Sequence, residues 1–479
     1  MLRKTRIVCT LGPATDSLDM LKAMLQAGMN VARLNFSHGT YEEHAARIEL
    51  LRQAEKEAGI DVALLLDTAG PEIRTGSVKD GQAMLKSGQP FLLTTREVEG
   101  DDTIVSVSYD QLPTSILKGQ HILLDDGLIR LEAISTTPTD IQCKIINGGR
   151  LTNRRGVNVP GAELPFPVLT EKDREDLRFG VEQGVDIVAA SFVRNADDVR
   201  SIRHRLNELG GRQFIVAKIE SLQGVDRLDE ILKLSDGVMV ARGDLGVEVA
   251  VEELPILQKE MIHRCNRIGK PVITATQMLD SMMRNPRPTR AEASDVANAI
   301  LDGTDAIMLS GETAAGLYPL EAVQTMARIA LQTEMSQLWR QQHDRRFRSD
   351  DELVDPISDS VARAACLLAE KVGAKAILTS THGGFTARQI SRFRPAAPII
   401  AATPTEIVRR QMMLSWGVIP LNVAHRDSTD GLMASALDAA CREGFVAQGD
   451  VVVITAGVPV GRSGSTNLIK VHRVGDSIH

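Results

Sequence analysis

The sequence contains few cysteines and no pattern that would join them. Its five cysteines are scattered over 479 residues, none lies in a CxxC pair, and no group of cysteines and histidines has the spacing of zinc ligands. A disulfide framework and a zinc site are therefore not expected, whereas a reducing compartment is. The first residues also lack the apolar stretch of a secretory signal, so we expect a cytoplasmic protein.

Long apolar runs and an excess of positive charge are missing as well. No stretch of about 18 consecutive apolar residues occurs, which argues against a membrane span. Lysine and arginine number 55 against 62 aspartates and glutamates, a formal net charge of −7, whereas nucleic-acid-binding proteins normally carry a basic excess. There is no GxxxxGK[ST] loop, and the protein-kinase motifs do not occur as a set. We therefore expect neither a membrane nor a nucleic acid as a partner.

Enough apolar sequence is present for a large folded core. Hydrophobic residues make up 43% and charged residues 24%, as in ordinary globular proteins, and this length suggests about two to four domains. Short β-branched runs alternate with helical patterns, which predicts a parallel α/β sheet. Eight such units favour a (β/α)8 TIM barrel over a doubly wound sheet. The predicted strands are Arg6–Thr10, Asn30–Leu34, Val62–Leu66, Asp186–Ala190, Phe214–Lys218, Gly237–Val240, Pro271–Ala275 and Asp305–Leu309.

Two parts of the chain depart from this rhythm. About 100 residues separate the third strand from the next helical pattern at Glu171–Glu182, and they carry short strand-like runs with little helical period. The runs are Phe91–Thr95, Thr103–Val107, Ile122–Leu124, Leu128–Ile134 and Ile141–Ile145. Such an insertion predicts an all-β lid domain on the catalytic face of the barrel. A polar linker over Gln341–Asp351 precedes further alternating elements: predicted helices at Ile357–Val372, Thr386–Phe393 and Glu406–Leu414 and predicted strands at Ala376–Thr379, Pro398–Ala402, Val418–Leu421 and Val451–Thr455. We predict barrel segments at residues 1–70 and 169–344, the lid at 71–168, and a C-terminal α/β domain at 345–479.

Polar residues gather where the predicted barrel strands end. The carboxyl ends of barrel strands meet at one face, where catalytic groups lie. A single polar strand end can mean only that the chain enters water, but seven of the eight ends carry mixed cations, carboxylates and hydroxyls. We therefore predict one polar mouth built from Arg33, Asn35, Ser37, His38, Asp67, Thr68, Glu72, Arg74, Ser191, Lys218, Glu220, Arg242, Asp244, Thr274, Thr276, Gln277, Ser310 and Glu312.

The charges at this mouth favour one chemistry. Glu220 and Asp244, on neighbouring strands, match the preference of Mg²⁺ for few protein ligands and for water and substrate oxygens in the remaining positions. The cations Arg33, Lys218 and Arg74 indicate that anionic oxygens bind beside the metal. A metal with several cations favours phosphoryl transfer, which depends mostly on positioning and charge neutralisation. For Lys218 and Glu220 alone, a structural ion pair is the alternative.

These residues lie in segments that resemble the pyruvate kinase family, in order and from about residue 3 to residue 476. One motif such as KIES or SGET would be weak evidence for this resemblance, but all of the motifs together in one chain are very specific evidence. The resemblance implies transfer of a phosphoryl group from phosphoenolpyruvate to ADP, giving pyruvate and ATP in the final step of glycolysis, by a compact bacterial-type enzyme of three domains. The segments are TRIVCTLGPAT, ARLNFSHG, LLLDTAGPEIRTG, GVNVPG, KIES, DGVMVARGDLGVE, ITATQMLDSM, MLSGETAAGLYPLEAV and ITAGVPVGRSGSTN.

The resemblance assigns roles at the mouth, position by position. Lys218 would neutralise charge on the transferred phosphoryl group, and Arg33 would contact the phosphate. Thr276 and Ser310 are the candidates for protonating the enolate that remains. We assign this step to a hydroxyl–water relay, because a threonine hydroxyl is a poor acid unaided. The substrate carboxylate would contact Gly243, Asp244 and Thr276.

The resemblance also implies two cofactors. Mg²⁺ or Mn²⁺ would bind Glu220 and Asp244. Family members with glutamate at the position of Glu72 tend to need K⁺, so we expect activation by K⁺; a solvated loop carboxylate is the alternative for Glu72. The remaining implied ligands are Asn35, Ser37, Asp67 and the Thr68 carbonyl for K⁺, and Asn35, Phe36, Ser37, His38, Arg74 and Lys172 for ADP or ATP.

A second ligand site is expected in the C-terminal domain. The segment Ser380–Thr386 joins a predicted strand to a predicted helix, and its glycines and hydroxyls at a helix N-terminus favour an anion. It resembles the family's loop for phosphorylated activators, with helix capping by Thr386 as the alternative. The family is usually tetrameric, which implies a homotetramer. The implied effector residues are Ser380, Thr381, His382, Gly383, Gly384, Thr386, Arg462 and Gly464.

Two other functions are alternatives to the kinase. A Mg²⁺-dependent lyase or aldolase of the barrel type, acting on pyruvate enolates, would use the same carboxylates but would need neither the ADP-side cations nor the β lid. A non-catalytic effector-binding protein predicts loss of Lys218, Glu220, Asp244 or Thr276, and all four are present. The kinase is therefore the preferred interpretation.

Overall fold

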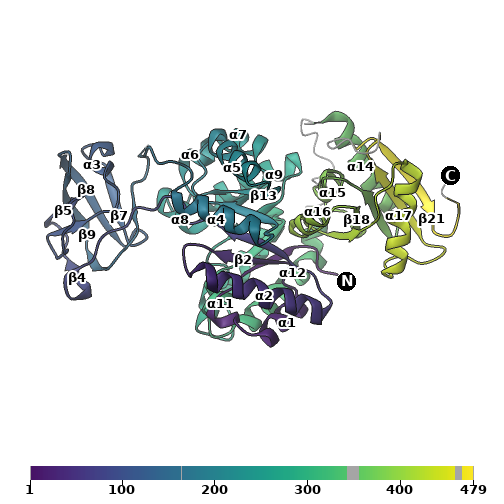
Figure 1. Cartoon of the computed structure of the whole chain (residues 1–479), viewed down its shortest axis with the longest axis horizontal. Coiled ribbons are helices and arrows are strands. Elements are labelled where there is room, and N and C mark those ends of the chain that lie inside the picture. The colour runs from purple at the N-terminus through teal and green to yellow at the C-terminus, as the bar shows by residue number, and fades with distance from the viewer. Residues whose placement is uncertain (1, 163, 342–354, 459–465, 478–479) are drawn as a thin grey trace.

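The computed structural model describes residues 2–162, 164–341, 355–458 and 466–477, which form three bodies in a row (Figure 1). A β-rich body lies at one end, a closed barrel in the middle and a C-terminal α/β body at the other end, beside the N-terminus. Within these ranges no helix has the length and apolar character needed to cross a membrane. The domain boundaries at residues 71, 169 and 345 stay predictions.

Eight parallel strands close into the central barrel, in the order β1-β16-β15-β14-β13-β12-β3-β2. The predicted (β/α)8 barrel is confirmed, and the doubly wound alternative is wrong because β1 also pairs with β16, which leaves this sheet without a free edge. The strands are β1 (Arg6–Thr10), β2 (Val31–Asn35), β3 (Ala63–Asp67), β12 (Ile187–Ala190), β13 (Phe214–Ile219), β14 (Gly237–Ala241), β15 (Val272–Ala275) and β16 (Ala306–Leu309).

Alternation along each strand gives the barrel a packed interior and an apolar outside. In β1, Val8 packs inside the barrel with Val31 and Ala63, whereas Ile7 and Cys9 pack among the surrounding helices. All five residues are fully buried. Burial on both faces explains why the strands read as continuous apolar runs in the sequence.

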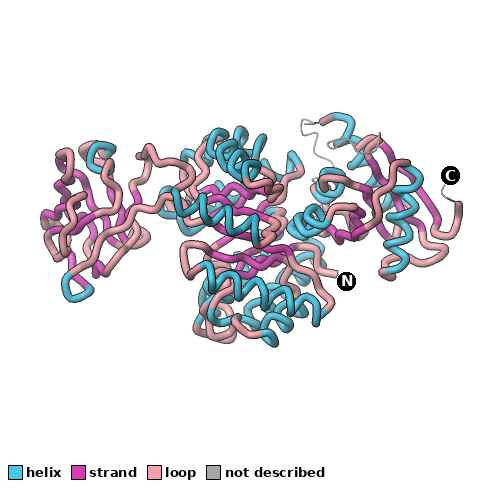
Figure 2. The backbone as a smooth tube through the Cα atoms, in the orientation of Figure 1, coloured by secondary structure: helices cyan, strands magenta, loops and turns pink. Residues whose placement is uncertain are grey.

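Helices surround the barrel strands (Figure 2), and some of them begin and end at capping signals in the sequence. Helix α2 (Tyr41–Ala58) starts with a reciprocal capping box of Thr40 and Glu43 and ends at Gly59, in the left-handed conformation. The other helical elements of the barrel are η1 (Pro13–Thr15), α1 (Leu18–Ala27), α4 (Glu171–Glu182), α5 (Ala196–Glu208), α6 (Leu222–Asp226), α7 (Leu228–Leu234), α8 (Arg242–Glu248), α9 (Leu254–Ile268), η3 (Asp280–Met283), α10 (Arg290–Asp302), α11 (Gly311–Ala314) and α12 (Pro319–Met335).

The inserted β-rich body has its own core and two sheets. A six-stranded sheet runs β11-β7-β8-β9-β5-β6, and a two-stranded sheet pairs β10 with β4. The five strands predicted in this region are present; the short strands β4, β10 and β11 were not predicted. The elements are η2 (Lys79–Gly81), β4 (Gln82–Leu85), β5 (Pro90–Thr94), β6 (Ile104–Ser106), α3 (Leu112–Ser115), β7 (His121–Leu124), β8 (Ile129–Thr136), β9 (Asp140–Asn147), β10 (Gly149–Thr152) and β11 (Val157–Asn158).

The C-terminal body is a five-stranded sheet in the order β19-β18-β17-β20-β21, with helices on both faces. Helix α17 and the antiparallel edge strand β21 were not predicted, and the predicted linker lies outside the described residues from residue 342 onward. The elements are α14 (Pro356–Lys371), β17 (Ala376–Ser380), α15 (Phe385–Ser391), β18 (Ile399–Thr403), α16 (Glu406–Gln411), η4 (Met412–Leu414), β19 (Val418–Asn422), α17 (Thr429–Arg442), β20 (Val451–Ala456) and β21 (Leu468–Arg473).

A short turn is part of the contact between the C-terminal body and the barrel. Met413 and Leu414 of η4 pack with the side chains that fill the barrel interior. Just before them, Gln411 Nε2 donates to the carbonyl oxygen of Asp186, at the start of β12. The C-terminal body therefore closes the end of the barrel where the strands begin, and the opposite end is left for the polar mouth.

Candidate active site

Side chains from three barrel strands meet at the carboxyl end of the barrel. Asp67 is the last residue of β3 and is fully buried. Arg33 on β2 donates from Nε to Asp67 Oδ2 at 2.6 Å, and Lys218 on β13 places Nζ 3.0 Å from Asp67 Oδ1. Lys218 Nζ also lies 2.8 Å from Glu220 Oε1. Two cations and two carboxylates thus form one connected cluster, so the ion pair offered as the alternative for Lys218 and Glu220 exists within a larger network.

The charges of this cluster keep one another ionised. Burial would raise the pKa of Asp67, but Arg33 and Lys218 together hold it below its ordinary value. Burial would likewise lower the pKa of Lys218, but Asp67 and Glu220 hold it above its ordinary value. The mouth therefore carries a fixed ammonium group at neutral pH, which suits an anionic substrate.

The segment that follows β12 holds both Lys218 and Glu220. Lys218 Nζ donates to Ser191 Oγ at 2.6 Å, and the Phe192 N–H donates to Glu220 Oε2 at 2.5 Å. This segment passes so close to Gly70, whose φ is 70°, that a Cβ atom there would lie 2.8 Å from Ser191 Cβ. Glycine is required at this turn by both its conformation and the space available.

A second wall of the mouth joins the start of α8 to the end of β15. The Gly243 N–H donates to Thr276 Oγ1 at 2.7 Å, and Thr276 Oγ1 in turn donates to Ala275 O at 2.6 Å. Thr276 has a φ of 69°, which is strained for a β-branched residue. Arg242 stabilises this conformation, because it donates to Thr276 O at 2.6 Å and to Asp295 Oδ2 at 2.7 Å.

The pair Glu220 and Asp244 fits a divalent cation. Burial and the charge of Glu220 raise the pKa of Asp244 to about 7, so the two carboxylates repel each other and a dication between them would remove the repulsion. In the described parts of the chain, no group of three or more His, Cys, Asp or Glu side chains has the geometry to hold a metal. An ion bound here would have two protein ligands and would complete its shell with substrate or water oxygens.

Oxygen atoms near Asp67 fit a monovalent cation. Asp67 Oδ1 is buried and, apart from its ion pair with Lys218, receives no hydrogen bond from the described residues. The adjoining Thr68 carbonyl accepts a hydrogen bond from Ser191 Oγ at 2.6 Å. Asn35 Oδ1 accepts one from the Ser37 N–H at 3.2 Å. Neutral oxygens and one carboxylate are the donor types that hard cations take.

The residues implied for nucleotide binding are not equivalent. His38 is exposed, whereas the Phe36 side chain is 2% exposed and stacks on the His44 ring at 4.2 Å. Lys172 Nζ donates to the Phe36 carbonyl oxygen and to Asp176 Oδ2, both at 2.7 Å. Phe36 therefore offers a nucleotide only its backbone, and Lys172 is held beside it.

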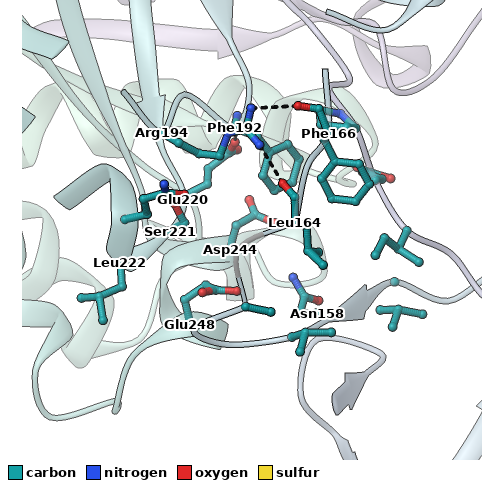
Figure 3. Close-up of a pocket in the computed structure, with 18 of the residues that line it drawn as sticks. Asn158, Leu164, Phe166, Phe192, Arg194, Glu220, Ser221, Leu222, Asp244 and Glu248 are labelled. Carbon is teal, nitrogen blue, oxygen red and sulfur yellow. Dashed lines mark hydrogen bonds between the residues drawn. The ribbon is translucent and has the colours of Figure 1, made fainter. Parts of the chain in front are cut away.

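A cavity of about 700 Å³ lies between the barrel mouth and the inserted lid (Figure 3). The barrel contributes Glu220 and Asp244 to its lining, and the lid side contributes Glu72 and Arg74. Arg33, Lys218 and Thr276, all within the described part of the chain, do not line this cavity. Arg74 Nε donates to Glu72 Oε2 at 2.7 Å, and the Glu72 side chain is 35% exposed. Glu72 is thus an exposed carboxylate paired with Arg74, and both the K⁺-linked role and the solvated loop carboxylate stay open.

Two residues predicted at the mouth are engaged elsewhere. Thr274 is fully buried and donates to Thr304 Oγ1 at 3.0 Å, beside the chain that enters β16. Glu312 accepts hydrogen bonds from the Ser310 N–H at 2.7 Å and the Leu279 N–H at 3.0 Å, which ties two loops together. Ser310 itself is half-buried at the end of β16.

Comparison with known proteins establishes the family. The family model described as pyruvate kinase, barrel domain, matches residues 2–323, and the one described as pyruvate kinase, alpha/beta domain, matches residues 359–472. The chain belongs to the pyruvate kinase family. It is therefore a phosphotransferase, as its sequence motifs predict.

Bacterial pyruvate kinases are similar over almost all of this chain. The chain is 52% identical over 478 residues to the pyruvate kinase of Sporosarcina psychrophila and 54% identical over 480 residues to that of Geobacillus stearothermophilus; each alignment covers 99% of this chain and 81% of the relative. Identity to the pyruvate kinase of Staphylococcus aureus is 52% over 480 residues, covering 100% of this chain and 81% of the relative.

The predicted effector loop lies between β17 and α15, and its hydroxyl groups are buried. The alternative role of Thr386 as a helix cap is wrong: the N-cap of α15 is Gly384, with a φ of 78° and no side-chain cap. Thr386 Oγ1 instead accepts a hydrogen bond from Thr466 Oγ1 at 3.0 Å. His382 is exposed and Gly383 is half-buried. Arg462 and Gly464 lie outside the described residues.

Some residues that shape the site were given no role by the sequence. Thr10, at the end of β1, accepts a hydrogen bond from Arg33 Nη1 at 2.9 Å. Arg242 and Ser191 were placed at the mouth without a function, although one stabilises Thr276 and the other contacts Lys218. The only available signal was a polar residue at a strand end, which does not say what the side chain contacts.

Proposed function

We propose that the chain transfers the phosphoryl group of phosphoenolpyruvate to ADP, giving pyruvate and ATP as the final step of glycolysis, and that it requires Mg²⁺ (or Mn²⁺) and K⁺. The strongest support is the ammonium group of Lys218, which Asp67, Glu220 and Ser191 hold within 3.0 Å. Phosphoryl transfer depends mainly on positioning and on neutralising charge. A rigid, buried cation beside a pair of metal-binding carboxylates provides both.

The roles proposed for the substrate contacts follow from the same geometry. Lys218 stabilises the negative charge on the phosphoryl group during transfer, and Arg33 binds its oxygens. When bound at Glu220 and Asp244, Mg²⁺ would supply further charge neutralisation. The turn at Gly243, with its neighbours Asp244 and Thr276, is proposed to orient the carboxylate.

Protonation of the enolate is proposed to use water. The Thr276 hydroxyl donates its proton to Ala275 O and accepts from the Gly243 N–H, so the hydroxyl has no free proton in this arrangement. A water between Thr276 and Ser310 would carry the proton instead, which agrees with the poor acidity of an alcohol.

The remaining assignments are also proposals. ADP is proposed to bind near Asn35–His38, Arg74 and Lys172. A phosphorylated metabolite is proposed to bind the C-terminal loop at residues 380–386, and the active protein is proposed to be a homotetramer. A cytoplasmic location is consistent with the five cysteines, which are all unpaired.

The decisive experiment measures pyruvate formation from phosphoenolpyruvate with ADP, Mg²⁺ and K⁺ each present or omitted. We expect a rate only when all three are present. No pyruvate under the complete conditions, even with a panel of sugar phosphates and AMP as activators, would contradict the proposal. Pyruvate without ADP would favour a barrel-type lyase.

Glu72 offers a sharper test of the K⁺ requirement. In the Glu72→Lys variant, the added ammonium group supplies near the site the positive charge that K⁺ would otherwise provide. We therefore expect this variant to be active without K⁺. If this variant keeps the full K⁺ requirement of the wild type, the role proposed for Glu72 is wrong.

A further inference from the structure

We propose that Ser191 is a positioning residue that links the Lys218 ammonium to the Thr68 carbonyl, and so couples phosphoryl transfer to the monovalent cation. The inference rests on the proposed function and adds a residue to which no role was assigned. Lys218 Nζ donates to Ser191 Oγ at 2.6 Å, and Ser191 Oγ donates to Thr68 O at 2.6 Å. One hydroxyl thus contacts both the phosphoryl-binding lysine and a cation-binding carbonyl.

The direction of these two hydrogen bonds is fixed by chemistry. An ammonium group has three donors and no acceptor, so Ser191 Oγ must accept from Lys218. The hydroxyl then has a single proton left, and the Thr68 carbonyl oxygen is its acceptor. In such a chain each hydrogen bond polarises the next, so the charge of Lys218 is felt at the carbonyl oxygen.

The backbone keeps Ser191 in this place. Ser191 is 2% exposed, and its N–H donates to Thr68 Oγ1 at 3.1 Å. The Thr68 N–H donates to Ala189 O at 3.0 Å, which continues the β3–β12 pairing of Asp67 with Ala189. Ser191 and Thr68 are therefore joined in both directions at the end of paired strands.

Ser191 differs from the other two acceptors of Lys218. Asp67 and Glu220 are carboxylates, and the resemblance assigns both to cation sites, so occupancy of those sites changes their attraction for the ammonium group. Ser191 is neutral and fixed. It therefore gives Nζ a neutral contact, and because its proton is donated to the carbonyl proposed for K⁺, K⁺ bound at that carbonyl acts on Nζ through this hydroxyl.

The test compares two serine-to-alanine variants. Ser191→Ala removes the link, whereas Ser391→Ala is the matched control: Ser391 is also 2% exposed and donates to Trp416 O at 2.6 Å, in the C-terminal body. For Ser191→Ala we expect kcat to fall roughly tenfold and the K⁺ concentration for half-activation to rise about threefold, with KM for phosphoenolpyruvate within about twofold of wild type. Ser391→Ala should change Tm without these kinetic effects.

A second readout does not depend on activity. Without substrates, KCl should raise the Tm of the wild type relative to tetramethylammonium chloride at equal concentration, because a ligand that binds only the folded state stabilises it. The same increase should appear in Ser391→Ala and be smaller in Ser191→Ala. If Ser191→Ala does not fold, Ser191→Cys, with its weak donor and acceptor, is expected to show the same two changes.

The outcomes separate this inference from the proposed function. A wild type without any K⁺ response overturns the K⁺ requirement and this inference together. A wild type that responds to K⁺, with a Ser191→Ala variant that matches it in kcat and in both K⁺ responses, overturns the role of Ser191 alone. A fall in kcat with unchanged K⁺ responses overturns the proposed coupling.

Discussion

The two ends of the barrel are built from the same eight strands but differ in how completely their charged groups are paired within the chain. At the mouth, Asp67 Oδ1 is buried and, apart from its ion pair with Lys218, receives no hydrogen bond from the described residues, and burial and the charge of Glu220 raise the pKa of Asp244. At the other end, Asp305 accepts from Arg394 Nη1 at 2.8 Å and from the Trp416 N–H at 3.2 Å. One end leaves charge for ligands, and the other pairs its charge within the chain.

Backbone strain occurs at both ends. Phe192, Thr276 and Gln277, which follow β12 and β15 at the mouth, have positive φ angles, and Arg394 at the opposite end has a φ of 51°. At that end, Met413 and Leu414 of the C-terminal body fill the barrel opening. Unmatched charge lowers stability and persists where function requires it. The comparison therefore predicts that substitutions at the mouth act on activity and that those at the opposite end act on stability.

The largest expected effect is the loss of the mouth's central cation. Lys218→Met should lower kcat for pyruvate formation about a thousandfold, since a preorganised charge at the transferred group is lost. Circular dichroism checks that the variant is folded. Lys22→Met, which removes a surface partner of Glu57, is the control and should keep the wild-type kcat. A kcat within tenfold of wild type for Lys218→Met would contradict the role given to this mouth.

The opposite end should respond in stability alone. Arg394→Met leaves the buried carboxylate of Asp305 without its ion-pair partner, and Arg394 is itself only 2% exposed. We expect a loss of about 3–5 kcal/mol in the free energy of unfolding, measured by urea denaturation, with kcat unchanged. A comparable fall in kcat would show that the two ends are not independent.

The smallest effect is a gain in stability at the mouth. A carboxyl group whose folded-state pKa is raised stabilises the fold at low pH, and this contribution disappears as the pH rises through the folded-state pKa, about 7 for Asp244. Asp244→Asn does not ionise, so without metal it should be more stable than wild type by about 1–2 kcal/mol at pH 8. The difference should vanish near pH 4.

Mg²⁺ provides the control for this prediction. Adding it at pH 8 should raise the Tm of the wild type more than that of Asp244→Asn, because only the wild type has both carboxylates. Equal stability of the two proteins at pH 8 without metal would contradict the proposed repulsion between Asp244 and Glu220.

The sequence predicted the secondary-structure elements better than it predicted the contacts between side chains. Each of the eight barrel strands lies within about one residue of its predicted bounds, since a run of β-branched apolar residues buried on both faces leaves few other interpretations. Strands β4, β10 and β11 were missed because they are short, and β11 spans only Val157–Asn158. Helix α17 and strand β21, in the C-terminal body, were missed as well.

The sequence by itself determined that this chain forms a barrel, which residues stand at the strand ends, and, through its motifs, which family it belongs to. Only the tertiary structure decided that Thr274 is buried against Thr304, that Glu312 binds the N–H groups of Ser310 and Leu279, and that Ser191 lies between Lys218 and Thr68. Strand ends are fixed by local pattern, whereas a side chain's partner depends on neighbouring strands that are distant in sequence. Lys218 meets Asp67 because β12 pairs with both β13 and β3 and so brings the ends of these two strands together.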